Sequence, residues 1–398
     1  MHNSHHVSAF RFPALHHHDV LQHKRALHSS FILSQRQYDT RLRSRPETQQ
    51  LRPIPTRHNS RLGSNFCTPT PKLFTQFRLF QTASMQSKAK LTSKIAIVGA
   101  GEVGSTIAYS LILNPITGDV LLIDPKTEVR DAQAQDLSDA TYHGNTSTRV
   151  RAADSKEAGQ CDIVVITAGA AQKEGESRTD LIGRNLKILK SAIDECKPFR
   201  DDAVLLIVAN PVDVLTHFAQ EFSGVPKSQV FGSGTFLDSV RLRGILANKS
   251  GVAASSIDAY VLGEHGDSQF VAWSQASIGG VPLSEIVKDS EVEINKNEIA
   301  EETKKKAASI MQAKGATAYG IGGVAASICK SILFDQRNIR PVSHWQEELG
   351  VCLSMPAVIG REGIVRTIPI RLDDEERKNL EGSVKSLKEV IEEAKKDQ

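Results

Sequence analysis

The segment from Lys94 to Asp124 constrains the fold more than any other stretch of this 398-residue chain. Residues 94–98 form a short apolar run typical of a buried strand, and residues 99–104 follow it with the pattern G-x-G-x-x-G. Apolar side chains at helical spacing continue to Leu113, and a second apolar run, 120–123, ends on Asp124. A strand, a glycine turn, a helix, a second strand and an acid about 20 residues beyond the motif predict a dinucleotide-binding βαβ unit.

Each glycine of this motif has a physical role. Gly99 permits the tight turn, Gly101 allows the backbone to approach a pyrophosphate, and Gly104 allows the helix to pack closely on the strand. The helix then presents free N–H groups and its positive dipole end to the phosphates. Asp124 can accept hydrogen bonds from both ribose hydroxyls, and its charge would repel a 2′-phosphate. We therefore predict NAD, rather than NADP, as the cofactor.

Strands and helices alternate from residue 91 to about residue 235, which predicts an α/β fold with a Rossmann doubly wound parallel sheet. The expected strands are 94–98, 120–123, 148–151, 162–167, 203–209 and 229–232, with helices that end near residues 113, 137 and 197.

The pattern changes after residue 235, where residues 236–398 are predicted to form an α+β domain for substrate binding and catalysis. The expected elements are a helix over 238–249, strands within 257–278, a long helical stretch over 295–333, extended segments over 351–370 and an amphipathic helix over 373–396.

Residues 1–90 have a different composition from the rest of the chain. They hold fourteen Lys and Arg, three acids and nine of the thirteen His, and they lack sustained apolar periodicity. This predicts a disordered basic leader, whose composition fits a mitochondrial transit peptide. The alternative is a true start at Met85, with an upstream extension that is not part of the protein.

The composition excludes several classes of function. Residues 91–398 carry 35 bases against 43 acids, so they do not predict a nucleic-acid surface. The five cysteines are scattered and have no histidine at ligand spacing, so neither a disulfide framework nor a metal site is expected. The apolar runs are too short to cross a bilayer, and no membrane partner is predicted.

Three further stretches carry candidate chemistry. His265 lies between glycines in G-E-H-G-D-S, Asp238 and Arg241 lie three residues apart on a predicted helix, and Arg178 ends a polar loop that follows a strand. Taken singly, each has an ordinary structural interpretation. Together they provide a proton donor near neutral pH, a carboxylate that raises its pKa, and arginines that can bind a planar carboxylate through two parallel hydrogen bonds.

In this order behind a dinucleotide fingerprint, these motifs resemble the NAD-dependent lactate/malate dehydrogenase family, and more closely its L-lactate branch. The resemblance covers about residues 93–398. It rests on the glycine fingerprint, A-G-x-x-Q-K-x-G-E-S-R, V-A-N-P-V-D, G-T-x-L-D-S-x-R, G-E-H-G-D-S and M-P-A-V-I-G-R-x-G-I.

The resemblance implies a role for each candidate residue. His265 would give and accept the proton, with Asp238 as its buried partner. Arg241 would bind the substrate carboxylate, and Arg178 would polarise the substrate carbonyl. The implied substrate contacts are Gln172, Arg178, Asn210, Arg241 and Thr317, and the predicted cofactor contacts are Gly99, Gly101, Glu102, Val103, Gly104, Asp124, Ala168, Gly169, Asn185, Val208, Asn210 and Ile321.

Gln172 distinguishes the two branches of the family. Malate dehydrogenases carry an arginine at this position, where it neutralises the second carboxylate of the substrate. Glutamine is neutral, nearby Glu176 adds a negative charge, and a buried unpaired carboxylate would cost several kcal/mol. Pyruvate and L-lactate are therefore preferred over oxaloacetate and malate.

The resemblance thus implies L-lactate dehydrogenase activity with NAD and a homotetramer. We expect the protein in the cytoplasm, or in mitochondria if the leader is a transit peptide. The rival enzymes are a malate dehydrogenase and a dehydrogenase of another 2-hydroxy acid. A catalytically silent NAD-binding protein and nucleic-acid binding through the leader are the alternatives from other classes.

Overall fold

The computed structural model describes residues 93–144, 148–170, 177–289 and 294–396 of the chain, and all of them belong to one compact unit. The predicted leader, residues 1–90, lies outside the described residues, so the expectation that it is disordered stays a prediction.

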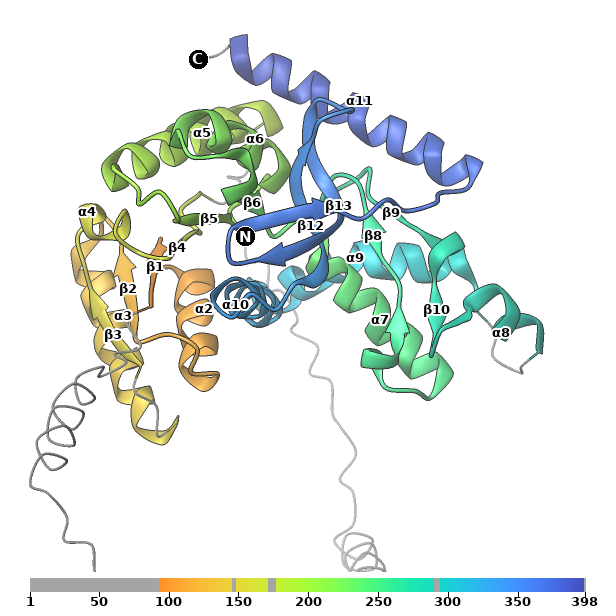
Figure 1. Ribbon diagram of the computed structural model, residues 1–398, viewed down its shortest axis with the longest axis horizontal. Helices are drawn as coiled ribbons and strands as arrows, with labels where there is room; N and C mark the ends of the chain where they lie inside the picture. Colours follow the sequence, from red (N-terminus) through yellow and green to blue (C-terminus); the bar gives the residue numbers. More distant parts are fainter. Residues whose placement is uncertain (1–92, 145–147, 171–176, 290–293, 397–398) are drawn as a thin grey trace, which may run out of the picture. The chain divides into compact units, whose positions relative to one another are not determined.

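The first half of the unit is built on six parallel strands in the order β3-β2-β1-β4-β5-β6 (Figure 1). This is the order of a dinucleotide-binding doubly wound sheet, and it confirms the predicted Rossmann fold. The strands are β1 (Lys94–Val98), β2 (Asp119–Ile123), β3 (Arg149–Ala152), β4 (Ile163–Ile166), β5 (Val204–Ile207) and β6 (Val230–Gly232).

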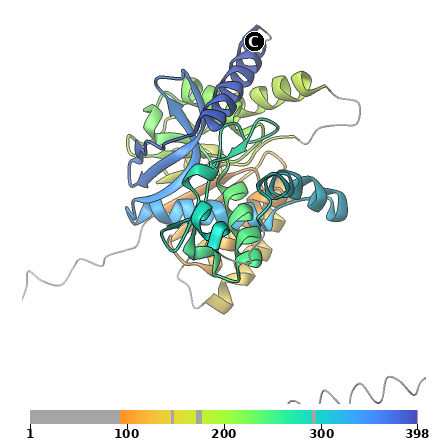
Figure 2. The same cartoon turned by 90° about the vertical axis from the view of Figure 1, so that its right-hand side faces the viewer.

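Helices cover both faces of this sheet, which is why its strands are apolar on both sides. In β1, Ile95 and Ile97 join one core cluster, while Ala96 and Val98 join the other. Figures 1 and 2 show the arrangement of these layers. The helices of this half are α2 (Glu102–Leu113), α3 (Thr127–Ala140), α4 (Ser155–Ala158), α5 (Arg178–Cys196) and α6 (Val212–Ser223).

The second half has a third core cluster formed by its first three helices and its short strands, whereas its last two helices join the core clusters of the first half. Its helices are α7 (Phe236–Ser250), α8 (Leu283–Asp289), α9 (Lys296–Lys314), α10 (Tyr319–Leu333) and α11 (Asp374–Lys396). Its short strands are β7 (Ile257–Asp258), β8 (Val261–Leu262), β9 (Phe270–Val271), β10 (Ser277–Ile278) and β11 (Val281–Pro282).

Three longer antiparallel strands join the two halves. They are β12 (Asn338–Gln346), β13 (Val351–Gly360) and β14 (Gly363–Thr367). β12 pairs with β6 through the single residue pair Ser343 and Gly232, so the parallel sheet continues into a nine-stranded mixed sheet. The α+β half is therefore attached to the edge of the Rossmann sheet next to β6.

Two of the longer elements were not predicted. Helix α6 connects β5 to β6, and its signals were present in the sequence: Pro211 precedes its first residue, and Gly224 ends it in the left-handed conformation. Strand β12 contains Pro341 and several polar residues, which weakens its strand pattern, but it pairs along its whole length with the buried strand β13.

One prediction was too simple. The long helical stretch over 295–333 is two helices, because Gly315 ends α9 with φ +82° and α10 begins only at Tyr319. The break matters because residues 315–317 line the cavity described below.

The close packing of α2 against the turn that follows β1 gives a test of this arrangement. A Cβ atom added at Gly104 would lie 1.9 Å from the Gly99 carbonyl oxygen, whereas one added at Gly244, inside α7, would meet nothing within 4 Å. We expect Gly104→Ala to lower the free energy of unfolding by about 1–3 kcal/mol or more. The control Gly244→Ala should raise it by up to about 1 kcal/mol. Urea denaturation measures both, and equal stability of the two variants would contradict the packing.

Candidate active site

In the glycine motif between β1 and α2, neighbouring atoms leave no room for a side chain at Gly99 and Gly104, whereas the space beside Gly101 is free. Gly99 has φ +108°, and a Cβ there would lie 2.6 Å from Thr167 Oγ1. At Gly101, a Cβ would meet nothing within 4 Å. The first helical hydrogen bond runs from the Ser105 N–H to the Gly101 carbonyl, so the N–H groups before Ser105 have no partner within the helix itself. Open space beside these donors fits the pyrophosphate of a dinucleotide.

Asp124 directly follows β2 and faces this turn. Its Oδ2 accepts the Ala100 N–H at 2.9 Å, and its Oδ1 accepts the Lys126 N–H at 2.8 Å. A carboxylate offers about four acceptor positions, so two remain for ribose hydroxyls. The donor and acceptor set of this edge of the sheet therefore fits NAD.

Asn185 on α5 links the loops that follow β4 and β5. The side chain is buried; its Oδ1 accepts the Ala170 N–H at 2.8 Å, and its Nδ2 donates to the Asn210 carbonyl at 2.9 Å. Both of these bonds go to the backbone. Asn185 therefore fixes the two loops relative to each other at the carboxyl edge of the sheet.

Three charged side chains, two from one helix and one from a separate segment of the second half, form a chain of contacts. His265 Nδ1 lies 2.7 Å from Asp238 Oδ2, and Arg241 Nη1 donates to Asp238 Oδ1 at 3.1 Å. Asp238 and Arg241 lie one turn apart on α7, which brings both to the same face of the helix. Because Asp238 faces Nδ1, the opposite ring nitrogen, Nε2, is the one that can exchange a proton with a ligand.

The electrostatics of this chain favour a protonated imidazole. Burial lowers the pKa of His265, but the charge and hydrogen bond of Asp238, together with the charge of Asp213, outweigh burial and raise the pKa above its ordinary value. Burial likewise raises the pKa of Asp238, while His265 and Arg241 outweigh it and lower that pKa. Both shifts favour an imidazolium beside a carboxylate.

His265 and Arg241 border a cavity of about 460 Å³ that also reaches the glycine turn and the ends of β4 and β5. One set of walls comes from the first half of the unit, and the other comes from α7, α9 and the start of α10. The predicted residues along it are Val103, Gly169, Asn185, Val208, Asn210, Arg241, His265, Thr317 and Ile321.

A proton donor and an arginine thus lie on a cavity next to a dinucleotide-binding turn. Comparison with known proteins agrees with this arrangement. Residues 93–232 match the NAD-binding domain of lactate/malate dehydrogenases, and residues 235–398 match the α/β C-terminal domain of the same family. The chain belongs to the lactate/malate dehydrogenase family.

Several members of the family are similar over most of their length. L-lactate dehydrogenase A of Rhizopus oryzae is 46% identical over 300 residues, which are 75% of this chain and 92% of that protein. L-lactate dehydrogenase 1 of Staphylococcus aureus is 40% identical over 307 residues, which are 76% of this chain and 97% of that protein.

Solved structures from the same family share the fold. The minor L-lactate dehydrogenase of Enterococcus mundtii superposes with a TM-score of 0.74 at 34% identity, over 76% of this chain and 98% of the other. A lactate dehydrogenase enzyme from a Medee basin deep-sea metagenome library gives a TM-score of 0.74 at 32% identity, over 76% and 99%.

The structure does not place every residue that the family resemblance assigns to the site. Gln172 lies outside the described residues. Arg178 is the first residue of α5, but its side chain is likewise outside the described part. The functional roles of these residues, and of the cofactor contacts predicted from the sequence, stay predictions.

The sequence analysis missed one wall of the cavity. Helix α9 contributes Ala307, Ala308 and Met311, and α7 contributes Leu237. Small residues on a charged helix carry no chemical signal, so the sequence could reveal their role only through the helical spacing of 307, 308 and 311, which places them on one face.

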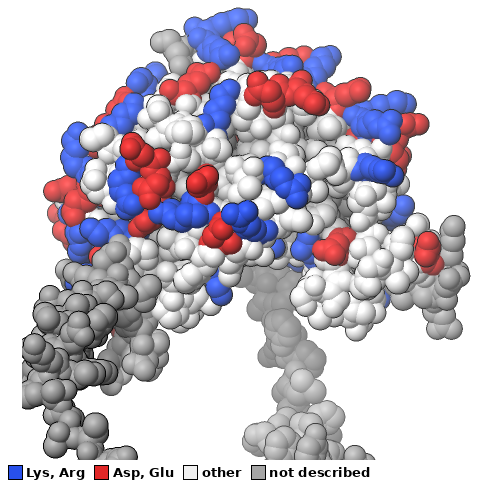
Figure 3. Space-filling model, viewed as in Figure 1, with Lys and Arg blue, Asp and Glu red and all other residues white. Residues whose placement is uncertain are grey.

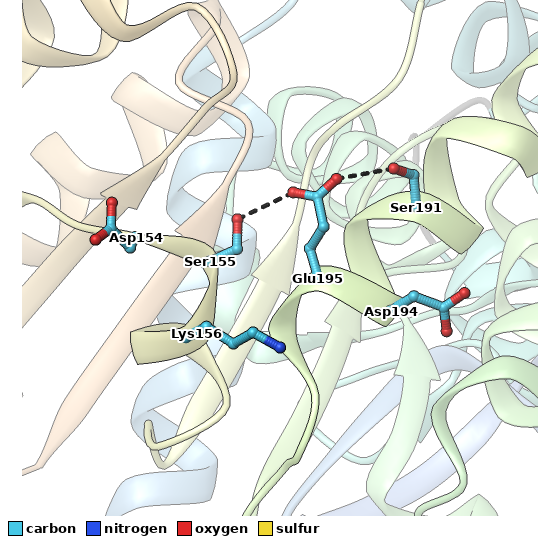
Figure 4. A pocket seen from close by; sticks show the side chains of 6 residues that line it. All are labelled: Asp154, Ser155, Lys156, Ser191, Asp194 and Glu195. Carbon is cyan, nitrogen blue, oxygen red and sulfur yellow. Dashed lines mark hydrogen bonds between the residues drawn. The ribbon is translucent and has the colours of Figure 1, made fainter.

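A second, more open hollow lies between α4 and α5 and has none of these properties (Figure 4). Glu195 accepts hydrogen bonds from Ser155 at 3.1 Å and Ser191 at 2.9 Å, while Asp194 pairs with Lys190. These exposed groups satisfy one another and leave no acid and base directed at a shared point. This hollow therefore does not combine a proton donor, an arginine and a dinucleotide turn as the cavity beside His265 does.

The surface charges and the remaining acidic, histidine and cysteine side chains do not point to a further class of ligand. On the face in Figure 3, acidic and basic side chains are interspersed. Within the described ranges, no three His, Cys, Asp or Glu side chains form a group that could hold a metal ion. Among those same residues, no helix is long and apolar enough to cross a membrane.

The link between His265 and Asp238 predicts a specific titration. In Asp238→Asn the larger of the two charges that raise the pKa is gone, and burial is then opposed only by the weaker effect of Asp213. We expect the pKa of His265 to fall below its ordinary value of about 6.5, so that the ring is neutral at pH 7. NMR of ring-labelled histidine measures the pKa, and an unchanged value would contradict the pairing.

Proposed function

We propose that this chain is an NAD-dependent L-lactate dehydrogenase that interconverts pyruvate and L-lactate. The observation that carries the proposal is the chain of contacts from His265 through Asp238 to Arg241, on a cavity that borders the glycine turn. The relatives and solved structures named above support the same activity.

The proposed reaction reduces a keto group. NADH, when bound, supplies the hydride to the keto carbon. His265 supplies a proton from Nε2 to the keto oxygen, and Asp238 stabilises the charged ring before the proton leaves. In the reverse direction, the neutral ring accepts the proton of the lactate hydroxyl. The raised pKa of His265 supports both roles near neutral pH.

Arg241 is proposed to bind the substrate carboxylate. Asp238 engages one of its nitrogens, Nη1, and orients the guanidinium, which has donors left for a planar anion. The same carboxylate therefore sets the direction of both the proton donor and the carboxylate receptor. Arg178 is proposed to close over the substrate and polarise its carbonyl, which would also exclude water.

The choice of pyruvate over oxaloacetate is proposed to depend on Gln172. The described walls of the cavity provide one arginine, Arg241, for one carboxylate. A second carboxylate would need a second cation, which a glutamine does not supply.

We expect Gln172→Arg to raise kcat/KM for oxaloacetate and lower it for pyruvate. The new cation pairs with the second carboxylate of oxaloacetate, while in the pyruvate complex it is left buried and unpaired. The ratio of the two kcat/KM values should shift by at least about 100-fold. NADH oxidation at saturating cofactor measures it. An unchanged ratio would contradict the role of Gln172, and wild-type preference for oxaloacetate would contradict the proposed substrate.

We also propose that the protein is a homotetramer and works in the cytoplasm. Helices α2 and α10 pack together and carry exposed large apolar side chains, Tyr109, Leu113 and Tyr319, which supports association between copies. Sedimentation velocity tests the first proposal. The cytoplasmic location is tested by imaging the full chain and a chain that starts at Met85. It would be overturned if the full chain, but not the shorter one, were imported into mitochondria.

A further inference from the structure

The segment that carries His265 is held by side chains that the reaction does not use. Gly263 exchanges two backbone hydrogen bonds with Ser354 of β13, at 3.0 and 2.9 Å. From there to Ser268 the chain forms no helix or strand. The two residues that follow Gly263 each have their N–H bound by a side chain from a distant part of the sequence.

The first of these side chains is Asp213, in the first turn of α6. Its Oδ2 accepts the His265 N–H at 2.6 Å, and the residue is 1% exposed. Within the described residues, its Oδ1 has no partner at hydrogen-bond distance, although the nearby Ser343 hydroxyl lowers the pKa of the carboxyl. An incompletely satisfied buried carboxylate costs free energy, so its presence beside a proton donor indicates more than a packing role.

The second side chain is Ser383 of α11, which is completely buried. Its Oγ accepts the Glu264 N–H at 2.7 Å and lies 3.0 Å from Ser268 Oγ. Ser268 also donates to Glu264 Oε2 at 2.5 Å. Gly263 has φ +86°, and a Cβ added there would lie 2.8 Å from Ser383 Oγ. Helix α11 is therefore pressed against the start of this segment.

We propose that Asp213 and Ser383 are positioning residues for proton transfer by His265. They hold two consecutive backbone N–H groups, while Asp238 holds the ring, so the imidazole is fixed from three different helices. This proposal rests on the proposed function. Asp213 has a second effect that Ser383 lacks, because its negative charge lies close to the imidazolium and stabilises it.

The charged groups around His265 and Asp213 determine how a substitution of Asp213 would affect the pKa of the imidazole. His265 is faced by Asp238 and Arg241 from α7 and by Asp213 from α6. Asp213 is faced by Glu264 and by Cys352 of β13, whose own pKa is raised well above its usual value by burial. Burial raises the pKa of Asp213 to about 6, so the carboxyl is still mostly ionised at pH 7.

The experiment compares Asp213→Asn and Ser383→Ala with two matched controls. Asp162→Asn removes a largely buried carboxylate that accepts the Lys94 N–H at 2.8 Å but lies at the opposite end of the strands. Ser331→Ala removes a buried hydroxyl on α10 that does not contact the segment. Pyruvate reduction and NADH binding are measured from pH 5 to 9.

In Asp213→Asn the amide oxygen can still accept the His265 N–H, but the charge is gone. Pyruvate reduction requires protonated His265 and falls as pH rises through its pKa. We expect this fall to move to lower pH by at least about half a unit. Ser383→Ala leaves the charges in place, so we expect kcat to drop by about tenfold with the pH profile unmoved. NADH binding should stay within twofold in both.

Three results would overturn the proposal. One is an unmoved pH profile in Asp213→Asn. Another is a loss of kcat in Ser383→Ala no larger than in Ser331→Ala. Should Asp213→Asn fail to fold, rapid hydrogen exchange of the Glu264 and His265 amides in the wild-type protein would show that neither N–H is held. If wild type does not reduce pyruvate, the proposed function fails instead, and NMR titration of His265 in the two variants still tests the positioning roles.

Discussion

The negative charge of Asp238 determines how the rest of the site is arranged. One buried carboxylate binds His265 through one oxygen and Arg241 through the other, so a single charge sets both the protonation of the ring and the direction of the guanidinium. Burying a carboxylate is unfavourable unless cations surround it, and here the lowered pKa shows that they outweigh the loss of water. The position of α7 therefore fixes the two groups together.

The sheet brings this charged cluster to the dinucleotide turn. Strand β12 continues the parallel sheet beyond β6, and β13, which pairs with β12, holds Gly263 through Ser354. The segment that carries His265 is thus linked, strand by strand, to the same sheet whose strand β1 leads into the glycine turn. The His265 side and the glycine-turn side of the cavity are both attached to this one sheet, which favours precise placement of reacting groups.

Much of this could be predicted from the sequence because local chemistry identifies it. The glycines at 99, 101 and 104, the acid at 124 and the alternating apolar runs each reflect a backbone or packing requirement within a few residues. The roles of Asp213 and Ser383 could not be predicted in this way. A lone aspartate and a lone serine carry no signal until the fold places them beside the segment from 263 to 268, and the cavity wall from α9 depends on the same long-range packing.

The hydrogen bond from Glu264 to Ser383 also has a consequence for the order in which the site assembles. The ribosome makes the glycine turn, Asp124, Asp213, Asp238 and His265 before it makes α11. A growing chain could therefore fold its Rossmann half early, as N-terminal parts commonly do, and still lack the contact that holds the histidine segment. Cofactor binding would then precede catalytic competence during synthesis, and a nascent chain would hold the dinucleotide without turning over substrate.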